Sequence, residues 1–161
     1  MKTTWRTLWQ QRDIVVYRDE VEVDRVAADD IVRVCLVYRG RGDYPGEVTQ
    51  SVVELSGDAG FVLFESNTGF AGRVNFERQS FWVERACVHW VSAAHALLPW
   101  RLRFGAWRGD GSSHAFRRLS RDELAGHVDR WPLEGPETWE ERKARRIERS
   151  RLFGHAGASP A

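Results

Sequence analysis

The longest amphipathic segment of the chain runs from Asn75 to Leu98. Successive residues of an α-helix are about 100° apart, and at this spacing the apolar residues of the segment gather on one side. These residues are Phe76, Val83, Cys87, Trp90, Val91, Ala94 and Leu98. Asn75 is a suitable N-cap, and Pro99 ends the pattern because the residue before a proline avoids the helical conformation. We therefore predict a long central helix over residues 75–98, packed against a β-sheet.

Short runs that favour β-strands precede this segment. The predicted strands occupy residues 14–17, 21–26, 31–38, 48–55 and 61–65. The polar turn at 18–20 joins the first two as a hairpin, and the continuous apolar run 31–38 predicts an inner strand. The chain does not alternate strands with helices, which is the pattern that would indicate a parallel sheet. The sequence therefore predicts an α+β fold, with five strands in an antiparallel meander.

The segments after Pro99 predict further strands and two helices. Apolar and polar residues alternate within residues 100–119, which predicts strands with one solvent-exposed face. Ser120 and Glu123 form a capping-box pattern that opens a short helix over 121–130. A charged helix follows over 134–153, because Pro136 suits a first helical position and acidic residues precede basic ones along the helix dipole. We assign residues 1–133 to one α+β domain, 134–153 to a helical extension and 154–161 to a disordered tail.

Two early segments carry a resemblance to a known family. The hairpin VVYRDEVEV and the strand ADDIVRVCLVY, followed by antiparallel strands and a closing helix, resemble the bacterial PH-like domains over about residues 5–98. The resemblance implies an antiparallel sheet or partly closed barrel, packed by the long amphipathic helix. The chain departs from the family in showing five clear strands where seven are expected. Its first hairpin turn is Arg18-Asp19-Glu20, and not the basic turn of lipid-binding members, so phosphoinositide binding is not implied.

Composition and charge limit the classes of protein to which the chain can belong. With 161 residues, 42% apolar and 29% charged, the chain fits one soluble domain. Its formal charge of +1 is unevenly spread, with 11 Lys and Arg against 14 Asp and Glu up to Trp100, and 13 against 9 beyond it. No apolar run approaches the ~18 residues that span a bilayer, and no N-terminal signal region is present. We expect no membrane insertion and a cytoplasmic protein in which Cys35 and Cys87 are reduced.

Catalytic and metal-binding patterns are missing from the sequence. His89 and His95 are six residues apart and do not share a helical face, so they do not match the paired histidines of zinc sites. No serine or cysteine stands in a nucleophile motif, and no glycine-rich loop is placed for nucleotides. We therefore predict no catalytic residue, metal or cofactor. An enzyme whose site is assembled from residues distant in sequence is kept as an alternative.

One candidate partner surface lies on the back of the predicted central helix, where cationic and aromatic residues alternate. Its members are Arg78, Phe81, Trp82, Arg85 and His89. Such a combination suits a protein partner or a single-stranded nucleic acid. The simpler interpretation, which we favour, is that the segment after Pro99 covers Phe81 and Trp82 as a second layer of core.

The C-terminal helix offers a second candidate surface. Trp139 and Ile147 are its candidate apolar anchors, either onto the protein's own sheet or onto a partner protein, and two such residues are too few to hold the helix by packing alone. Its cationic residues are the nucleic-acid alternative: Arg142, Lys143, Arg145, Arg146, Arg149 and Arg151. A third pattern, Arg39-Gly40-Arg41, either forms a backbone concavity for an anion or is a plain turn, and glycine suffices to explain a turn.

The sequence thus favours a non-enzymatic interaction module that binds an unidentified protein partner over nucleic-acid binding. Partner identity and oligomeric state are left open.

Overall fold

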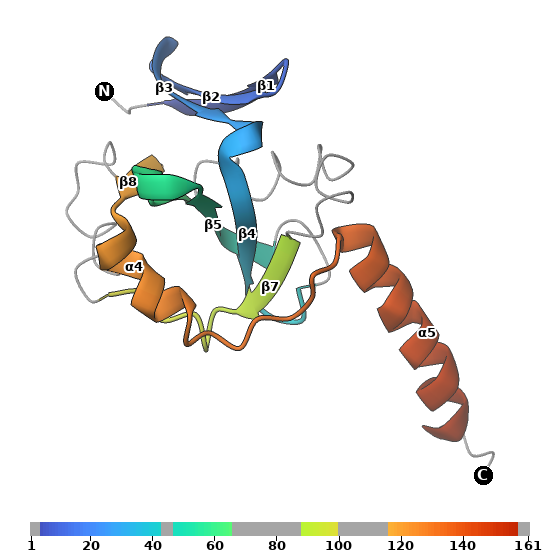
Figure 1. The fold of residues 1–161 in the computed structure, drawn as a ribbon. Coiled ribbons are helices and arrows are strands. Elements are labelled where there is room, and N and C mark those ends of the chain that lie inside the picture. The colour runs from blue at the N-terminus through green and yellow to red at the C-terminus, as the bar shows by residue number, and fades with distance from the viewer. Residues whose placement is uncertain (1–3, 43–46, 66–87, 100–115, 158–161) are drawn as a thin grey trace.

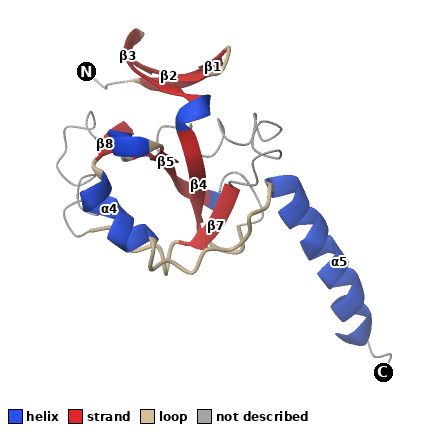
Figure 2. Cartoon of the chain, in the orientation of Figure 1, coloured by secondary structure: helices blue, strands red, loops and turns tan. Residues whose placement is uncertain are grey.

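The computed structural model describes residues 4–42, 47–65, 88–99 and 116–157, which together form an α+β fold (Figure 1). Strands run from the top to the centre of the molecule, one α-helix lies to the left of them and the C-terminal α-helix extends to the lower right (Figure 2). The α+β class expected from the sequence is confirmed for this part of the chain. Of the predicted central helix, residues 75–87 lie outside the described residues, as do 100–115 of the predicted later strands.

The N-terminal residues form a three-stranded antiparallel sheet. Its strands are β1 (Trp5–Gln10), β2 (Asp13–Arg18) and β3 (Val21–Ala27), in that order across the sheet. The predicted hairpin is present, and Asp19 and Glu20 make its two-residue turn with φ of 50° and 66°, as type I′ hairpin turns require. β1 was not predicted, because its apolar residues Trp5 and Leu8 are three apart and do not show the alternation of a strand.

A five-stranded mixed sheet follows, in the order β7-β4-β5-β6-β8. Its strands are β4 (Ile31–Tyr38), β5 (Val48–Leu55), β6 (Phe61–Glu65), β7 (Val88–Ser92) and β8 (Phe116–Leu119). Short 3₁₀ turns precede β4 (Ala28–Asp30) and β6 (Gly57–Ala59). β4 has a neighbour on each side, as predicted for an inner strand. Gly60 closes the β5–β6 turn with φ of 74°, where a Cβ would collide with the Leu119 carbonyl oxygen.

The prediction of a helix through residues 88–98 is wrong. Residues Val88–Ser92 form β7, which pairs in parallel with β4, and a turn follows at 93–95. Valines and tryptophan favour strands, and pairing with β7 satisfies the backbone groups along one side of the buried strand β4. Trp90 is fully buried, as expected of a core residue, but it reaches the core from a strand. Ala94, predicted on the buried face, is exposed.

The core consists of two apolar clusters, one on each face of the five-stranded sheet. Along β4, Val34 and Leu36 belong to the cluster shared with the three-stranded sheet, whereas Cys35 and Val37 belong to the opposite cluster. That opposite cluster includes Leu124 and other residues of α4 (Arg121–Val128) and the segment after it. The described residues are therefore layered as sheet, sheet and helix, and they form no closed barrel. We call strands β1–β8 and α4 the body.

The two C-terminal helices begin at capping boxes. In α4, the Ser120 side chain accepts from the Glu123 N–H while Glu123 accepts from the Ser120 N–H, as the sequence predicts. In α5 (Trp139–Gly157), the Thr138 Oγ1 accepts from the Glu141 N–H at 3.2 Å, and the Glu141 carboxylate accepts from the Thr138 N–H at 2.9 Å. The second capping box places the helix start after residue 138 and not at 134, so that boundary of the prediction was wrong.

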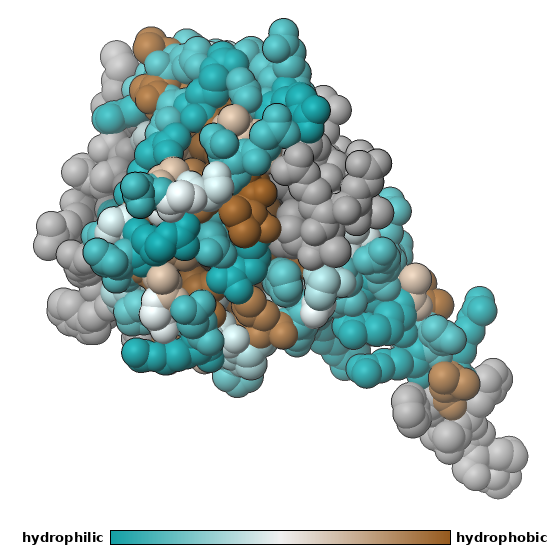
Figure 3. Space-filling view, viewed as in Figure 1, coloured by the Kyte–Doolittle hydropathy of each residue, from teal (hydrophilic) through white to brown (hydrophobic). Residues whose placement is uncertain are grey.

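The far end of α5 also differs from the prediction. The helix continues to Gly157, into the segment expected to be disordered. It extends away from the body as an arm (Figure 1), and its surface is mostly hydrophilic with isolated apolar side chains (Figure 3). Among the residues described, no helix combines the length and apolar character needed to cross a membrane.

Candidate functional site

The segment between the two α-helices follows the outer edge of β7. The Trp90 N–H donates to the Glu134 carbonyl at 2.9 Å, and the Glu134 N–H donates back to the Trp90 carbonyl at 2.7 Å. Further along, the Glu137 N–H donates to the Val88 carbonyl at 2.8 Å, and the Trp90 indole N–H donates to the Glu137 carbonyl at 3.0 Å. These bonds fix Glu134 and Glu137 beside the sheet, immediately before α5 begins.

Arg142, in the first turns of α5, joins the helix to this segment. Its guanidinium donates to the Glu134 carboxylate at 2.7 Å and to the Glu137 carboxylate at 3.2 Å. A third bond runs to the Arg41 carbonyl at 3.3 Å. Only 8% of Arg142 is exposed. Burial lowers its pKa, but the hydrogen bonds and charge interactions with Glu134 and Tyr38 together more than compensate, so the pKa is raised above the ordinary value. A buried cation with several charged partners is an anchor for the helix.

Aromatic rings complete the surroundings of Arg142. Its guanidinium carbon lies 4.7 Å from the centre of the Tyr38 ring and 5.0 Å from that of Trp90, within the range of cation–π contacts. The Tyr38 hydroxyl bonds the two Glu134 carboxylate oxygens at 2.8 and 3.0 Å. Burial raises the pKa of Tyr38, and the bond to Glu134 raises it further. Tyr38 therefore stays protonated and donates to Glu134.

The loop after β4 approaches Arg142 from the other side. Gly42 has φ of 68°, and a Cβ there would lie 2.8 Å from the Tyr38 ring. Its N–H donates to the Glu47 carboxylate at 2.7 Å, so the turn is held by an acceptor across the loop. Only glycine fits this position. The close approach brings the Arg41 carbonyl within reach of Arg142.

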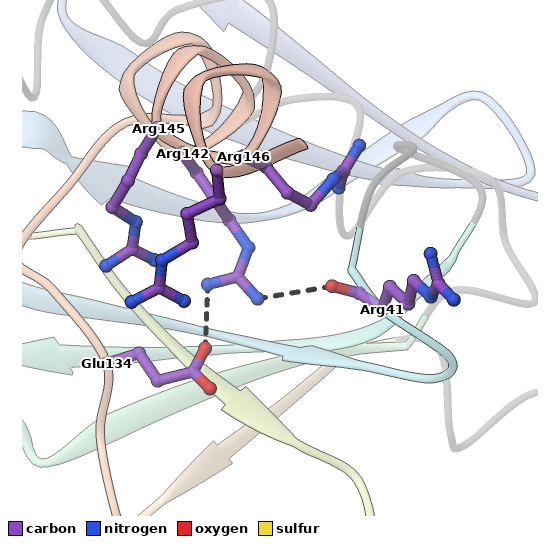
Figure 4. Close-up of a pocket in the computed structure, with 6 residues that line it drawn as sticks. Arg41, Glu134, Arg142, Arg145 and Arg146 are labelled. Atoms are coloured by element: carbon purple, nitrogen blue, oxygen red, sulfur yellow. Dashed lines mark hydrogen bonds and ion pairs between the residues drawn. The ribbon is translucent and has the colours of Figure 1, made fainter. Parts of the chain in front are cut away.

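Between α5 and this loop lies a half-open hollow of about 260 Å³. Its lining residues, which define what we call the arginine hollow, are Arg41, Glu134, Arg142, Arg145, Arg146 and Arg149. In Figure 4, Arg142, Arg145 and Arg146 extend from α5 towards Glu134, whereas Arg41 directs its carbonyl oxygen to Arg142 and its side chain away. Arg145 also donates to the Glu137 carboxylate at 2.9 Å. The hollow is thus strongly cationic.

The structure divides the six C-terminal cations that the sequence grouped together. Arg142, Arg145, Arg146 and Arg149 recur at spacings of three and four residues and line the arginine hollow. Lys143 and Arg151 are exposed and, with the 47% exposed Ile147, follow one another at four-residue spacing along a different side of α5. Trp139 begins α5, but its side chain lies outside the described part of the structure. The six cations therefore do not share one surface.

Of the other predicted surface, the structure describes only His89. Arg78, Phe81, Trp82 and Arg85 lie outside the described residues. His89, assigned to the back of a helix, belongs to β7 and stands opposite Cys35 in the register with β4. Because β7 is a strand, the helical spacing that grouped His89 with Arg85 does not apply.

Catalytic chemistry finds little support among the described residues. No group of three or more His, Cys, Asp and Glu side chains there could hold a metal ion. Burial raises the pKa of the Cys35 thiol to about 12. A thiol with so high a pKa stays protonated and unreactive at neutral pH.

Comparison with known proteins adds no assignment: no family model, no curated protein and no solved structure matches this chain.

Sequence reasoning missed Tyr38, Glu134 and Glu137, the partners of Arg142. In the sequence, Tyr38 is the last residue of an apolar strand, and the two glutamates resemble solvated charges before a helix, so neither pattern indicates a contact with Arg142. One signal was present in the sequence: Thr138 and Glu141 have the spacing of a capping box. That signal fixes where α5 begins and hence which side chains lie in its first turns.

Proposed function

We propose that the protein is a non-enzymatic binding module that presents α5 to a partner protein. The observation that supports this proposal is the way α5 is held. Its first turn is fixed to the body through Arg142, whose guanidinium bonds Glu134 and lies over the Tyr38 and Trp90 rings, whereas the rest of the helix extends into solvent (Figures 1 and 3). Helical arms with little packing of their own gain stability when a partner covers them.

The contact surface is the outer stripe of α5, formed by Lys143, Ile147 and Arg151. Ile147 supplies an apolar anchor between two cations. Over the whole helix, six Lys and Arg face three Glu, so the complementary partner surface is acidic with an apolar pocket at its centre. A large aliphatic side chain that is 47% exposed on a projecting helix is the kind of residue that interfaces bury.

The body serves as the rigid support in this proposal. We extend the proposal to a PH-like relationship of the body, on the strength of the β2–β3 hairpin and the strand β4 that carry the resemblance. The parallel pairing of β7 with β4 is a departure from that pattern, so the relationship is proposed for the fold alone and brings no ligand with it.

Site-specific photo-crosslinking in the native cell tests the function. A photoreactive residue placed at Ile147 is expected to give a discrete adduct with an acidic protein, identified by mass spectrometry. The matched control places the same residue at Val32 of β4, which is 52% exposed on the body.

The proposal also predicts the salt dependence and the mutational response. The purified partner should bind the wild-type chain and lose affinity in Ile147→Ser, with only modest weakening by salt. A nuclease-sensitive adduct at position 147 would instead favour nucleic-acid binding, for which affinity falls with salt at a log–log slope of about −0.7 to −0.9 per phosphate contact. Equal adduct patterns at 147 and 32 would refute a role for α5.

A further inference from the structure

Five groups outside α5 surround the guanidinium of Arg142. They are the rings of Tyr38 and Trp90, the carboxylates of Glu134 and Glu137, and the carbonyl oxygen of Arg41. We call these five groups the guanidinium cage. The rings belong to β4 and β7, and the other groups belong to the loop after β4 and to the segment along β7. Because none of them is part of the helix that supplies Arg142, the cage is a site that receives a side chain from another element.

The cage is held in place by bonds that do not involve Arg142. The backbone of Glu134 is paired with Trp90 in both directions, at 2.9 and 2.7 Å. The Glu137 N–H donates to the Val88 carbonyl at 2.8 Å, and the Tyr38 hydroxyl orients the Glu134 carboxylate by donating to it at 2.8 Å. Trp90 is fully buried and Tyr38 is 6% exposed. The cage is therefore preorganised, and a ligand that enters it does not have to order it.

The chemistry of the cage suits a guanidinium better than an ammonium group. A guanidinium is planar and carries five N–H donors in a fixed fork. It can face two rings, whose centres lie 4.7 and 5.0 Å from its carbon, while its N–H groups donate to two carboxylates and a carbonyl. Figure 4 shows the bonds to Glu134 and to the Arg41 carbonyl. An ammonium group is a compact point charge, so it lacks the planar face that stacks on rings.

Glu134 provides most of the negative charge that faces the ligand. Glu137 is shared, because Arg145 donates to it at 2.9 Å. Glu134 is instead bonded to Arg142 at 2.7 Å and to the uncharged hydroxyl of Tyr38. Its charge is thus directed at the cation in the cage, and the cage is matched to one guanidinium.

We propose that the guanidinium cage is a binding site for the arginine side chain of another protein, and that Arg142 occupies it in cis while α5 is docked. Arg142 is only 8% exposed, so an external arginine does not reach the filled cage. A tethered side chain competes at a roughly millimolar effective concentration, so the external arginine binds when α5 is undocked. The half-open arginine hollow, lined by Glu134 and Arg142, gives access from solvent once Arg142 has left. Arg142 is thus an autoinhibitory occupant of the site.

The experiment empties the cage and titrates it with arginine and lysine probes. The emptied form is full-length Arg142→Ala. A second emptied form, Arg142→Ala/Arg145→Ala, prevents Arg145 from entering the cage in place of Arg142. The probes are N-acetyl-arginine amide, which mimics an arginine within a chain, free L-arginine, and N-acetyl-lysine amide as a cation of equal charge. Heteronuclear NMR at constant ionic strength follows the amide resonances of Tyr38, Trp90 and Glu134.

Two further variants control for folding and for the location of binding. Lys143→Ala removes a charge from the same turn of α5 but leaves Arg142 in the cage, so it should bind no probe. Arg142→Ala/Glu134→Gln empties the cage and removes its main charge, so it should bind the arginine probe at least about tenfold more weakly than Arg142→Ala. Circular dichroism verifies that each variant is folded, and Arg142→Gln replaces Arg142→Ala if that variant does not fold.

We expect N-acetyl-arginine amide to bind Arg142→Ala saturably in the millimolar range. Its binding should be at least about tenfold tighter than that of N-acetyl-lysine amide. The wild-type protein should show no saturable shift at the same concentrations, because Arg142 fills the cage. Weaker binding of L-arginine than of N-acetyl-arginine amide would support a protein side chain as the ligand. Tighter binding of L-arginine would overturn that assignment in favour of the free amino acid.

Several results would overturn the proposal: no saturable binding to either emptied form, equal binding of the arginine and lysine probes, or unchanged affinity in Arg142→Ala/Glu134→Gln. Binding to the wild-type protein as tight as to Arg142→Ala would overturn the inhibitory role of Arg142. The proposal does not depend on the protein-docking role of α5. Failure of the titrations would leave the Ile147 crosslink unchanged, and failure of the crosslink would leave the titrations unchanged.

Discussion

Within the body, Val34, Leu36 and Trp90 are fully buried, whereas along α5 Ile147 and Leu152 keep 47% and 67% of their surface exposed. The body is stabilised by two continuous apolar clusters to which every strand of the larger sheet contributes. Among the described residues, α5 is joined to it through the polar and aromatic contacts of one buried arginine, Arg142.

Because of this difference, we expect the body and α5 to respond differently to mutation. Apolar burial is non-directional and distributed over many side chains, so the body is expected to unfold as one cooperative unit. Hydrogen bonds and cation–π contacts depend on the position of a single guanidinium. α5 should therefore separate from the body without unfolding it.

The largest effect is expected from Trp90→Ala. Its side chain is fully buried and its indole N–H donates to the Glu137 carbonyl, so the free energy of unfolding should fall by about 3–5 kcal/mol. Urea denaturation monitored by circular dichroism measures it. The control is Leu97→Ala, at a side chain 53% exposed, with an expected loss under about 0.5 kcal/mol. Equal losses would contradict the placement of Trp90 in the core.

Arg142→Ala should have a smaller and more local effect. It removes the bonds to Glu134 and Glu137, with an expected cost of roughly 2 kcal/mol for docking of α5. Hydrogen exchange should rise in residues 143–152 while β4 and β5 keep their protection. Arg142→Lys retains the charge but loses the planar fork, and should give an intermediate increase. If exchange in the body rose equally, α5 would not be separable.

Raising the pH into the alkaline range tests the burial of two groups, the Cys35 thiol in the body and the Tyr38 hydroxyl beside the start of α5. The pKa of Cys35 is raised from 9.0 to about 12, so above pH 9 the unfolded chain loses this proton first. Its contribution to stability is complete below pH 9 and is lost as the pH rises to 12, by up to about 1.4 kcal/mol per pH unit. Cys35→Ala should flatten the loss. The pKa of Tyr38 is also raised, so Tyr38→Phe should remove a further part of the loss. An unchanged pH profile in Cys35→Ala would contradict its burial.

The smallest effects are expected from a matched pair of variants, one in each capping box. Ser120→Ala and Thr138→Ala each remove a side-chain acceptor at a helix start, with an expected cost of about 1 kcal/mol. In Ser120→Ala this cost should lower global stability, because α4 packs against the sheet. In Thr138→Ala it should appear only as faster amide exchange in the first turn of α5. A global loss in both variants would show that α5 belongs to the cooperative unit.

Local patterns determined much of the body. Alternation and β-branched residues predicted β2, β3, β4, β5 and β6, and the spacing of Ser120 and Glu123 predicted the start of α4. Such features depend on neighbours in sequence, so they are readable there. The missed start of α5 is of the same kind, because Thr138 and Glu141 carry the same capping pattern.

The tertiary structure decided what local pattern left ambiguous. Residues 88–92 fit a helical period, yet they form β7, because pairing with β4 overrides a periodicity that a short apolar run shares with strands. The contacts of Arg142 at the start of α5 could likewise not be predicted from the sequence. Tyr38 and Arg142 are 104 positions apart in the chain, and only the packing of β7 against β4 and of residues 134–137 against β7 brings them into contact. Contacts of that separation depend on the whole fold, which no window of sequence contains.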